Sequence, residues 1–404
     1  MYQNISILAA FVFIYSIVGG RLERTPINGA FVFAVFGLAF GPLGLGFLNL
    51  RIDAEGIRTI AELTLALVLF TDASNADLGI LKRSIRIPER LLLIGLPLTI
   101  LLGFAAGVLI FDELTLLEVA VLATLLAPTD AALGKAVVAD KRVPANIRQG
   151  LNVESGLNDG ICVPVLFVFL AVAASTGHEG SPTLLALELV AEEIGIGALV
   201  GIGLTLLGSW FLRLCSTQGW LTETWRLVLV ASLAVSCFAA AQTLGGSGFI
   251  ACFIGGLLFG WMTHKHKHAL LLAGEGVGDT LSLLTWVAFG AAVISRHAHA
   301  FSWDKLLYAL LSLTVIRMLP VVLALAGTGL KTGETLFIGW FGPRGLASIV
   351  FGVIVLGENL PGGDIIVPTA ALTIALSVIA HGLSANPLVG WLAARESKAR
   401  PDTT

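Results

Sequence analysis

Thirteen apolar segments separated by short polar loops constrain this chain more than any other feature of its sequence. A membrane-spanning helix needs about 20 mostly apolar residues, and in lipid only helices or closed barrels satisfy all of their own backbone hydrogen bonds. Only 13% of the residues are charged, against about 25% in a typical soluble domain. The sequence therefore predicts an all-α polytopic membrane protein with about 13 transmembrane helices. The segments lie at 4–20, 27–46, 57–80, 91–111, 115–138, 147–173, 184–212, 225–244, 247–262, 269–294, 305–328, 334–356 and 365–393.

The distribution of lysine and arginine over the loops predicts how the chain is oriented. Of the 24 basic residues, 17 fall in loops on one side, four fall on the other side, and three fall at membrane depth. Because cytoplasmic loops carry the excess of positive charge, we expect the N-terminus outside and the C-terminus in the cytoplasm of a prokaryotic inner or plasma membrane. The three basic residues at membrane depth, Lys135, Arg317 and Arg344, require an explanation.

Two of the segments are interrupted by helix-breaking residues. The segment at 115–138 contains Pro128, and the segment at 334–356 contains Pro343 between glycines. The two lie seven segments apart, so they cross the membrane in opposite directions, as two inverted repeats would place them. Interrupted helices at corresponding positions of inverted halves point to a transporter's binding site near the bilayer midplane. The alternative is two unrelated proline kinks in packing helices.

Carboxylates lie at membrane depth in and beside the first interrupted segment. Asp130 is about midway along 115–138, and "GLNVESGLNDG" at 150–160 places Glu154 and Asp159 about midway along the next segment. Each such charge costs about 2.5 to 3.5 kcal/mol at the centre of a membrane helix. Intramembrane carboxylates of this kind are therefore read first as functional residues with a partner to be named.

Helical spacing divides "ESGLND" into two faces, because residues four apart lie on the same side of a helix. Glu154 and Asn158 form one face, and Ser155 and Asp159 form the other. We expect Ser155 and Asp159 to face Asp130 and a hydrated cavity, while the other face turns into the protein, towards Arg317 and Thr129.

The buried cations have predicted partners. Buried charges are retained chiefly in pairs, so Glu154 is expected to form a structural ion pair with Arg317. Arg344 is expected to hold exposed carbonyl groups of the interrupted helices, or a carboxylate. Lys135 is expected to reach the cytoplasmic surface.

The remaining groups form an all-oxygen site of carboxylates, a hydroxyl and the carbonyls of a broken helix. Oxygen ligands suit hard cations. Desolvation disfavours the ionised form of a carboxylate, so such a group can hold either a proton or a cation near neutral pH. This competition is the chemistry of cation/proton exchange.

Several motifs together resemble those of the NhaP/NHE-like sodium/proton antiporters, in the order and the segments expected for that family. They are "APTDAALG" at 127–134, "ESGLND" at 154–159, "VIRMLPVV" at 315–322, "FGPRGLAS" at 341–348 and "HGLSANPLVGWL" at 381–392. The resemblance implies a homodimer in which a six-helix core moves against a scaffold by elevator-like alternating access. It assigns 1–90 and 174–294 to the scaffold and linking helix, and 91–173 and 295–404 to the core and a short cytoplasmic tail.

The resemblance also implies roles for individual residues. Asp159 would bind the ion or the proton, with Ser155, Thr129 and Asp130 lining the site. Glu154 would bond Arg317. Asn158, in place of a second aspartate, resembles the electroneutral branch of the family. Where the family often supplies a further carboxylate from the third segment, this chain has Asp72 in "FTDASNADLG", either as an auxiliary ion residue or as part of a local polar contact.

Other functions remain as alternatives. A K+/H+ antiporter uses the same chemistry, and a sodium-coupled organic-solute carrier uses a related fold. An intramembrane serine protease would need Ser247 of "GGSG" close to His381. The tract "THKHKH" at 263–268 is expected to set topology rather than bind a metal. No enzymatic activity, cofactor or nucleic-acid partner is expected, and the partners are the bilayer, a monovalent cation and the proton.

Overall fold

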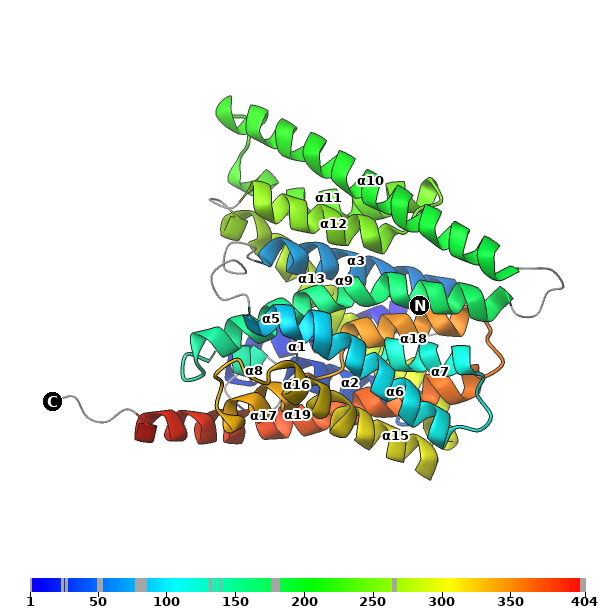
Figure 1. Cartoon of the computed structure of the whole chain (residues 1–404). Coiled ribbons are helices and arrows are strands. Elements are labelled where there is room, and N and C mark those ends of the chain that lie inside the picture. Colours follow the sequence, from blue (N-terminus) through cyan, green and yellow to red (C-terminus); the bar gives the residue numbers. More distant parts are fainter. Residues whose placement is uncertain are drawn as a thin grey trace.

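The computed structural model describes residues 2–22, 25, 28–48, 54–76, 86–130, 133, 135–138, 140–175, 182–263 and 267–399, and the regular elements within them are all helical. Figure 1 shows these helices running alongside one another. The α-helices are α1 (Tyr2–Leu22), α2 (Gly29–Phe40), α3 (Ala54–Asn75), α5 (Arg86–Arg90), α6 (Leu96–Ile110), α7 (Leu116–Leu125), α8 (Lys135–Val138), α9 (Ala145–Ser175), α10 (Pro182–Thr217), α11 (Glu223–Thr243), α12 (Gly248–Met262), α13 (Lys267–Ala288), α14 (Ser295–His297), α15 (Trp303–Leu313), α16 (Val315–Ala324), α17 (Thr332–Trp340), α18 (Leu346–Gly357) and α19 (Gly363–Ala399). Two π-helical stretches, η1 (Leu91–Gly95) and η2 (Phe289–Ile294), and the short 3-10 helix η3 (Ala298–Ala300) complete them.

The helices agree with a membrane-embedded chain, and the all-α fold class is confirmed. Eight helical stretches in the described part of the chain are long and apolar enough to cross a membrane. Shorter apolar helices add to them, namely α2, α7, α12 and α18. Each of the thirteen predicted segments contains at least one helix. The number of thirteen crossings stays a prediction, because several of these helices are shorter than a full membrane span.

Both predicted interruptions are present. In the segment at 115–138, α7 ends at Leu125 and the short α8 begins only at Lys135. In the segment at 334–356, α17 ends at Trp340 and α18 begins at Leu346. A third interruption was not predicted: α15 and α16 meet at Thr314, whose backbone angles of φ −113° and ψ −93° leave the helical region. Neither glycine nor proline stands at Thr314, so no local signal predicts an interruption there.

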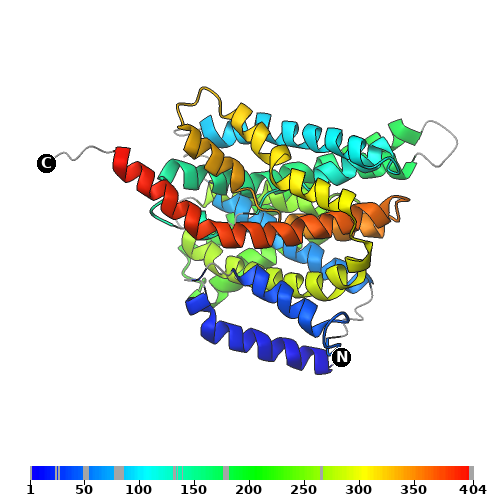
Figure 2. The same cartoon turned by 90° about the horizontal axis from the view of Figure 1, so that it is seen from below.

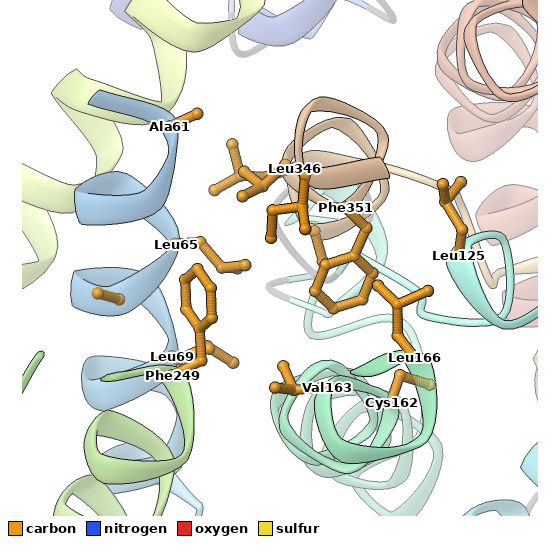
Figure 3. Close-up of a cluster of buried hydrophobic side chains, with 14 of the residues drawn as sticks. Ala61, Leu65, Leu69, Leu125, Cys162, Val163, Leu166, Phe249, Leu346 and Phe351 are labelled. Carbon is orange, nitrogen blue, oxygen red and sulfur yellow. The ribbon is translucent and has the colours of Figure 1, made fainter. Parts of the chain in front are cut away.

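Helix α9 lies in the interior and connects two groups of helices. In Figure 1, α10, α11 and α12 lie on one side of α3 and α9, while α15, α16, α17 and α19 lie on the other. Figure 3 shows Leu65 of α3, Val163 of α9 and Phe351 of α18 pointing into one shared cluster, and all three are buried. This packing fixes the depth of α9 relative to the interrupted helices.

Two glycines of α9 face neighbouring helices. A Cβ atom on Gly160 would overlap the Phe253 ring of α12, whereas a Cβ on Gly156 would lie 3.4 Å from Cβ of Asp72 on α3, an ordinary contact. Glycine at 160 thus lets α12 pack directly against the backbone beside Asp159.

Helix α1 lies at the edge of the bundle beside α2 (Figure 2), and none of its residues is buried. Large apolar side chains such as Phe13 and Ile17 on α1, and Leu199 and Trp210 on α10, are exposed in the single chain. Lipid or another protein surface must cover these faces. Residues 264–266 of the histidine tract, and the side chains of His268 and Lys135, lie outside the described residues.

Candidate functional site

The two interrupted helices meet and hydrogen-bond directly. The backbone N–H of Asp130 donates to the carbonyl oxygen of Pro343 over 2.8 Å. The Asp130 carboxylate accepts from the backbone N–H of Leu346 at 2.9 Å and from that of Leu133 at 3.3 Å. The first N–H groups of a helix lack partners within the helix and carry partial positive charge. Asp130 therefore caps the N-terminus of α18 from the opposite interrupted helix.

Arg344 makes the reciprocal contact. Its guanidinium, which has no exposed surface, donates to the carbonyl oxygens of Ala127 at 2.7 Å and Pro128 at 3.2 Å, just beyond the C-terminus of α7. It also reaches Ser312 O at 3.4 Å, beside the interruption at Thr314. Arg344 was expected to hold either exposed carbonyl groups or a carboxylate, and the structure shows carbonyl groups. An acid thus faces a positive helix end and a cation faces a negative one, which is the favourable arrangement in both cases.

Gly342 and Gly345, on either side of Arg344, lie where a side chain would have no room. A Cβ atom on Gly345 would overlap the Asp130 carboxylate, and a Cβ on Gly342 would overlap the Arg317 guanidinium. Neither glycine has a positive φ angle. Their function in this structure is to let charged side chains of neighbouring segments approach the backbone.

Substituting Gly345 is accordingly expected to displace Asp130 from the N-terminus of α18. We predict that Gly345→Ala destabilises the protein by about 1–3 kcal/mol, the usual cost of overpacking, and slows any transport that needs this crossing. Gly352→Ala on the same helix is the matched control, because a Cβ there meets no atom within 4 Å. Thermal unfolding in detergent compares the two, and equal unfolding temperatures would contradict the prediction.

Helix α9 places its polar side chains against Thr129. The Ser155 hydroxyl donates to Thr129 O, and the Asn158 amide donates to Thr129 Oγ1 over 2.8 Å. The contact of Asn158 with Thr129 was expected for its face of "ESGLND", whereas the contact of Ser155 with the same residue was not. Thr129 is not helical, so its carbonyl oxygen and its hydroxyl are both available as acceptors. It therefore accepts one hydrogen bond from each face of α9.

Asp159 lies next to this contact and is buried, with 7% of its surface exposed. Its Oδ1 atom has no hydrogen-bond partner among the described residues. The carboxylates of Asp130 and Asp72 are close enough to act on it electrostatically. Asp159 thus combines burial, nearby negative charge and a carboxylate oxygen that is free to bind.

Glu154 forms the predicted contact with Arg317. The pair is bidentate, with Nη1 2.6 Å from Oε1 and Nη2 2.8 Å from Oε2, and each side chain is 2% exposed. Paired guanidinium and carboxylate groups in this geometry form strong hydrogen bonds with fixed orientation. The contact ties α9 to α16 one turn after the interruption at Thr314.

Asp72 is half-buried on α3, and its backbone and Cβ lie against Gly156 of α9. It interacts electrostatically with Asp130 and with Glu275 and Asp279 of α13. Glu275 also accepts a hydrogen bond of 2.6 Å from the Asn75 amide. These carboxylates extend from the partly exposed surface of α13 towards the centre of α9.

A small cavity opens between the interrupted helices and α9. Three predicted site residues, Thr129, Asp130 and Ser155, line this cavity, whereas Asp159 does not. The rest of the lining comprises Val137, Val138, Leu151, Phe341 and Pro343.

The residues proposed for a serine protease are not brought together. Ser247 caps α12 by accepting from the backbone N–H of Ile250. The ring nitrogens of His381 lie against Ser377 and Trp340 instead. Ser377 and His381 were missed as part of the interrupted region, although their spacing of four in an apolar segment was a signal.

The chain is similar over most of its length to known cation/proton antiporters. The family model described as "Sodium/hydrogen exchanger, transmembrane" matches residues 7–391. A K(+)/H(+) antiporter NhaP2 from Shewanella oneidensis is 23% identical over 90% of this chain and 62% of its own length. A K(+)/H(+) antiporter NhaP from Alkalimonas amylolytica is 24% identical, with 99% of this chain and 69% of the relative covered. A Na(+)/H(+) antiporter from Schizosaccharomyces pombe is 25% identical over 72% of this chain and 67% of the relative.

The chain spans less than two thirds of the length of the Shewanella relatives, between 62% and 64%. Among solved structures, the sodium proton antiporter MjNhaP1 from Methanocaldococcus jannaschii has a TM-score of 0.76 at 21% identity, covering 95% of this chain and 99% of the other. That likeness shows the shared fold. Because the family model matches almost the whole chain, the protein belongs to the sodium/hydrogen exchanger transmembrane family.

Proposed function

We propose that the protein is a secondary-active monovalent cation/proton antiporter that exchanges cytoplasmic Na+ or Li+ for H+, with the two ions competing for Asp159. The observation that carries this proposal is the buried Asp159 carboxylate, whose Oδ1 lacks a hydrogen-bond partner among the described residues. A buried ionised carboxylate without a partner is costly. Binding either a cation or a proton removes that cost, and the two cannot occupy the same oxygen together.

Oxygen atoms in a cavity near Asp159 support a cation, and Ser155 of that cavity lies one helical turn from Asp159. Thr129, Asp130 and Ser155 line one small cavity, and oxygen ligands suit Na+, Li+ and K+. The Asp130 carboxylate already accepts two backbone N–H groups, so its main contribution to the site is negative charge beside Asp159. Asp72, with Glu275 and Asp279, would attract cations towards the site.

The transport cycle follows from this competition. Na+ leaves on one side, Asp159 takes a proton, the core moves, the proton leaves on the other side, and Na+ binds again. The core moves readily only when the charge of the site is neutralised, because moving an exposed charge through the membrane is costly. This restriction couples the two fluxes.

The moving part would comprise residues 91–173 and 295–404, and the scaffold would comprise 1–90 and 174–294. Helix α9 of the moving part packs on α3 and α12 of the scaffold at Gly156 and Gly160, so the two parts would move past each other there. The exposed apolar faces of α1 and α10 suit a homodimer interface. The N-terminus would lie outside and the C-terminus in the cytoplasm.

K+ is the alternative cargo, because the Shewanella and Alkalimonas relatives are described as K(+)/H(+) antiporters while the Schizosaccharomyces relative is described as a Na(+)/H(+) antiporter. The test uses purified protein in proteoliposomes with an internal pH dye, to which Na+, Li+ or K+ is added in turn. Alkalinisation with Na+ and Li+ supports the proposal, and alkalinisation with K+ alone assigns K+ as the cargo. If none of the three cations moves protons, cation/proton antiport is wrong.

The stoichiometry is predicted to be one proton for each cation. Asn158 is a neutral amide that donates to Thr129, so Asp159 is the one residue of the Asn-Asp pair that titrates. An imposed membrane potential, set with K+ and valinomycin during Na+-driven exchange, is therefore expected to leave the net proton flux unchanged. A flux that follows the potential would show electrogenic exchange.

A further inference from the structure

Two residues of α19, Ser377 and His381, hold both ends of the interruption in the segment at 334–356, the twelfth of the thirteen. The non-helical stretch runs from Phe341 to Gly345, between Trp340 of α17 and Leu346 of α18. Ser377 has no exposed surface and His381 has 2%. They lie four residues apart and so on one face of α19. No step of the proposed transport cycle uses either of them.

A chain of hydrogen bonds joins the two ends of the interruption through these residues. The backbone N–H of Arg344 donates to Ser377 Oγ over 2.7 Å. Ser377 Oγ lies 3.2 Å from His381 Nδ1, and His381 Nε2 lies 2.8 Å from the carbonyl oxygen of Trp340. These hydrogen bonds therefore link Trp340, the last residue of α17, to Arg344, near the start of α18.

The chemistry of imidazole fits this chain. A neutral ring has one N–H donor and one acceptor nitrogen. With its proton on Nε2, His381 donates to Trp340 O, and its Nδ1 accepts from the Ser377 hydroxyl, which itself accepts from Arg344. Nδ1 also lies 2.8 Å from Ser377 O within α19, and a carbonyl oxygen only accepts. A ring that carries protons on both nitrogens would donate to Trp340 O and Ser377 O together. In both of these states Nε2–H donates to Trp340 O.

Other contacts hold the ring in place. The Trp340 indole stacks on His381 with ring centroids 5.1 Å apart, and its Nε1 donates to Ser384 Oγ over 2.8 Å. The end of α17 is thus attached to α19 by its backbone and by its side chain. The ring cannot turn away without losing both packing and hydrogen bonds.

The hydrogen bonds of Ser377 and His381 to Arg344 and Trp340, here called the clamp, connect to the cation site through Arg344. Ser377 fixes the backbone of Arg344, and the Arg344 guanidinium holds Ala127 O and Pro128 O. Those carbonyls directly precede Thr129, which binds the Ser155 hydroxyl. A shift of Arg344 would therefore move the backbone that lines the cavity, although neither Ser377 nor His381 reaches the cavity itself.

We propose that His381 and Ser377 are positioning residues for cation binding: together they set the separation of the two ends of the interrupted twelfth segment and, through Arg344, the position of the Thr129 oxygens. This proposal rests on the proposed function. Residues outside a metal site that orient its ligands typically change affinity by about 10- to 100-fold when removed. The effect should therefore appear in cation affinity rather than in maximal rate.

The test compares matched variants in proteoliposomes across a range of Na+ concentrations. His381→Gln keeps an amide that reaches Trp340 O, whereas the amide of His381→Asn is too short, although both side chains are polar. Ser377→Ala removes the acceptor for Arg344 N–H. Thr373→Val is the control on the same helix, because the Thr373 hydroxyl is buried and donates only to Thr369 O of its own helix.

We expect His381→Asn and Ser377→Ala to raise the half-saturating Na+ concentration about tenfold with little change in maximal rate. His381→Gln and Thr373→Val should stay close to the wild type. Unchanged half-saturation in both His381→Asn and Ser377→Ala would overturn the proposal. So would a loss of maximal rate that only follows the amount of folded protein.

A second readout separates this proposal from the proposed function. Hydrogen–deuterium exchange of the amides at 341–346, measured in detergent, should be faster in His381→Asn and Ser377→Ala than in wild type and Thr373→Val. If wild-type protein moves no protons in response to cations, the proposed function fails, and the amide exchange still decides whether the clamp exists. Equal exchange rates in all variants would refute the clamp.

Discussion

Replacing Asp159 by asparagine is expected to abolish cation-dependent proton movement in proteoliposomes, with a loss of about a hundredfold or more. The amide has nearly the same size as the carboxylate, so packing beside α3 and α12 should survive. It carries no negative charge for a cation and takes up no proton near neutral pH. Fluorescence of an internal pH dye after a Na+ pulse measures the effect.

Asp140→Asn is the matched control for this substitution. Asp140 lies between α8 and α9, where the Arg142 guanidinium holds the pKa of that carboxyl below its usual range through a hydrogen bond of 2.7 Å. It therefore stays ionised over the working pH range, and it lies outside the cavity lining. Retained exchange in Asp159→Asn, at the rate of the Asp140→Asn control, would show that another group carries the ions.

The second large effect is expected at the ion pair of Glu154 and Arg317. Removing one partner of a buried pair leaves an uncompensated charge and costs about 3–5 kcal/mol. Both side chains are 2% exposed, so Glu154→Leu or Arg317→Met alone should lower the unfolding temperature in detergent strongly. Replacing both residues, as Glu154→Leu with Arg317→Met, should recover most of the lost stability, because well-packed apolar residues often replace a buried pair without loss.

A double-mutant cycle on thermal unfolding measures this coupling. Recovery in the double variant identifies the pair as a structural link between α9 and α16. Additive losses from the two single substitutions would instead mean that each residue stabilises the protein through separate contacts.

Together, Asp130 and Arg344 explain how non-helical backbone is tolerated at the crossing. The carboxylate satisfies N–H groups at the start of α18, and the guanidinium satisfies carbonyl groups beyond the end of α7. Ser348 adds a hydroxyl that donates to Leu125 O over 2.9 Å. Interrupted helices at membrane depth persist where protein groups replace the missing hydrogen bonds, and these three residues do so here.

Features that follow from the cost of polar groups in lipid could be predicted from the sequence alone. Pro128 and Pro343 marked the two interruptions, and the need of Glu154 for a cation led to Arg317. The interruption at Thr314 was not predictable in this way, because neither glycine nor proline stands there, and the contact beside it, from Arg344 to the carbonyl of Ser312, comes from a distant segment.

The partners of individual side chains were harder to predict than their depth. Helical spacing separated Ser155 from Asn158 and led Asn158 to Thr129. Ser155 reaches the same residue, because the non-helical backbone there exposes a carbonyl beside the hydroxyl. Likewise Asp130 was expected mainly as an ion ligand, and only the three-dimensional crossing revealed that its carboxylate caps α18.

The central claim is that one carboxylate holds either the cation or the proton, and the most direct test counts protons released when Na+ binds. Purified protein in weakly buffered detergent solution is titrated with NaCl while pH and bound Na+ are recorded. Because a ligand that binds metal must first lose its proton, we expect about one proton released for each Na+ bound by the wild type, and neither binding nor release by Asp159→Asn. Na+ binding without proton release, or equal release by the variant, would contradict the account.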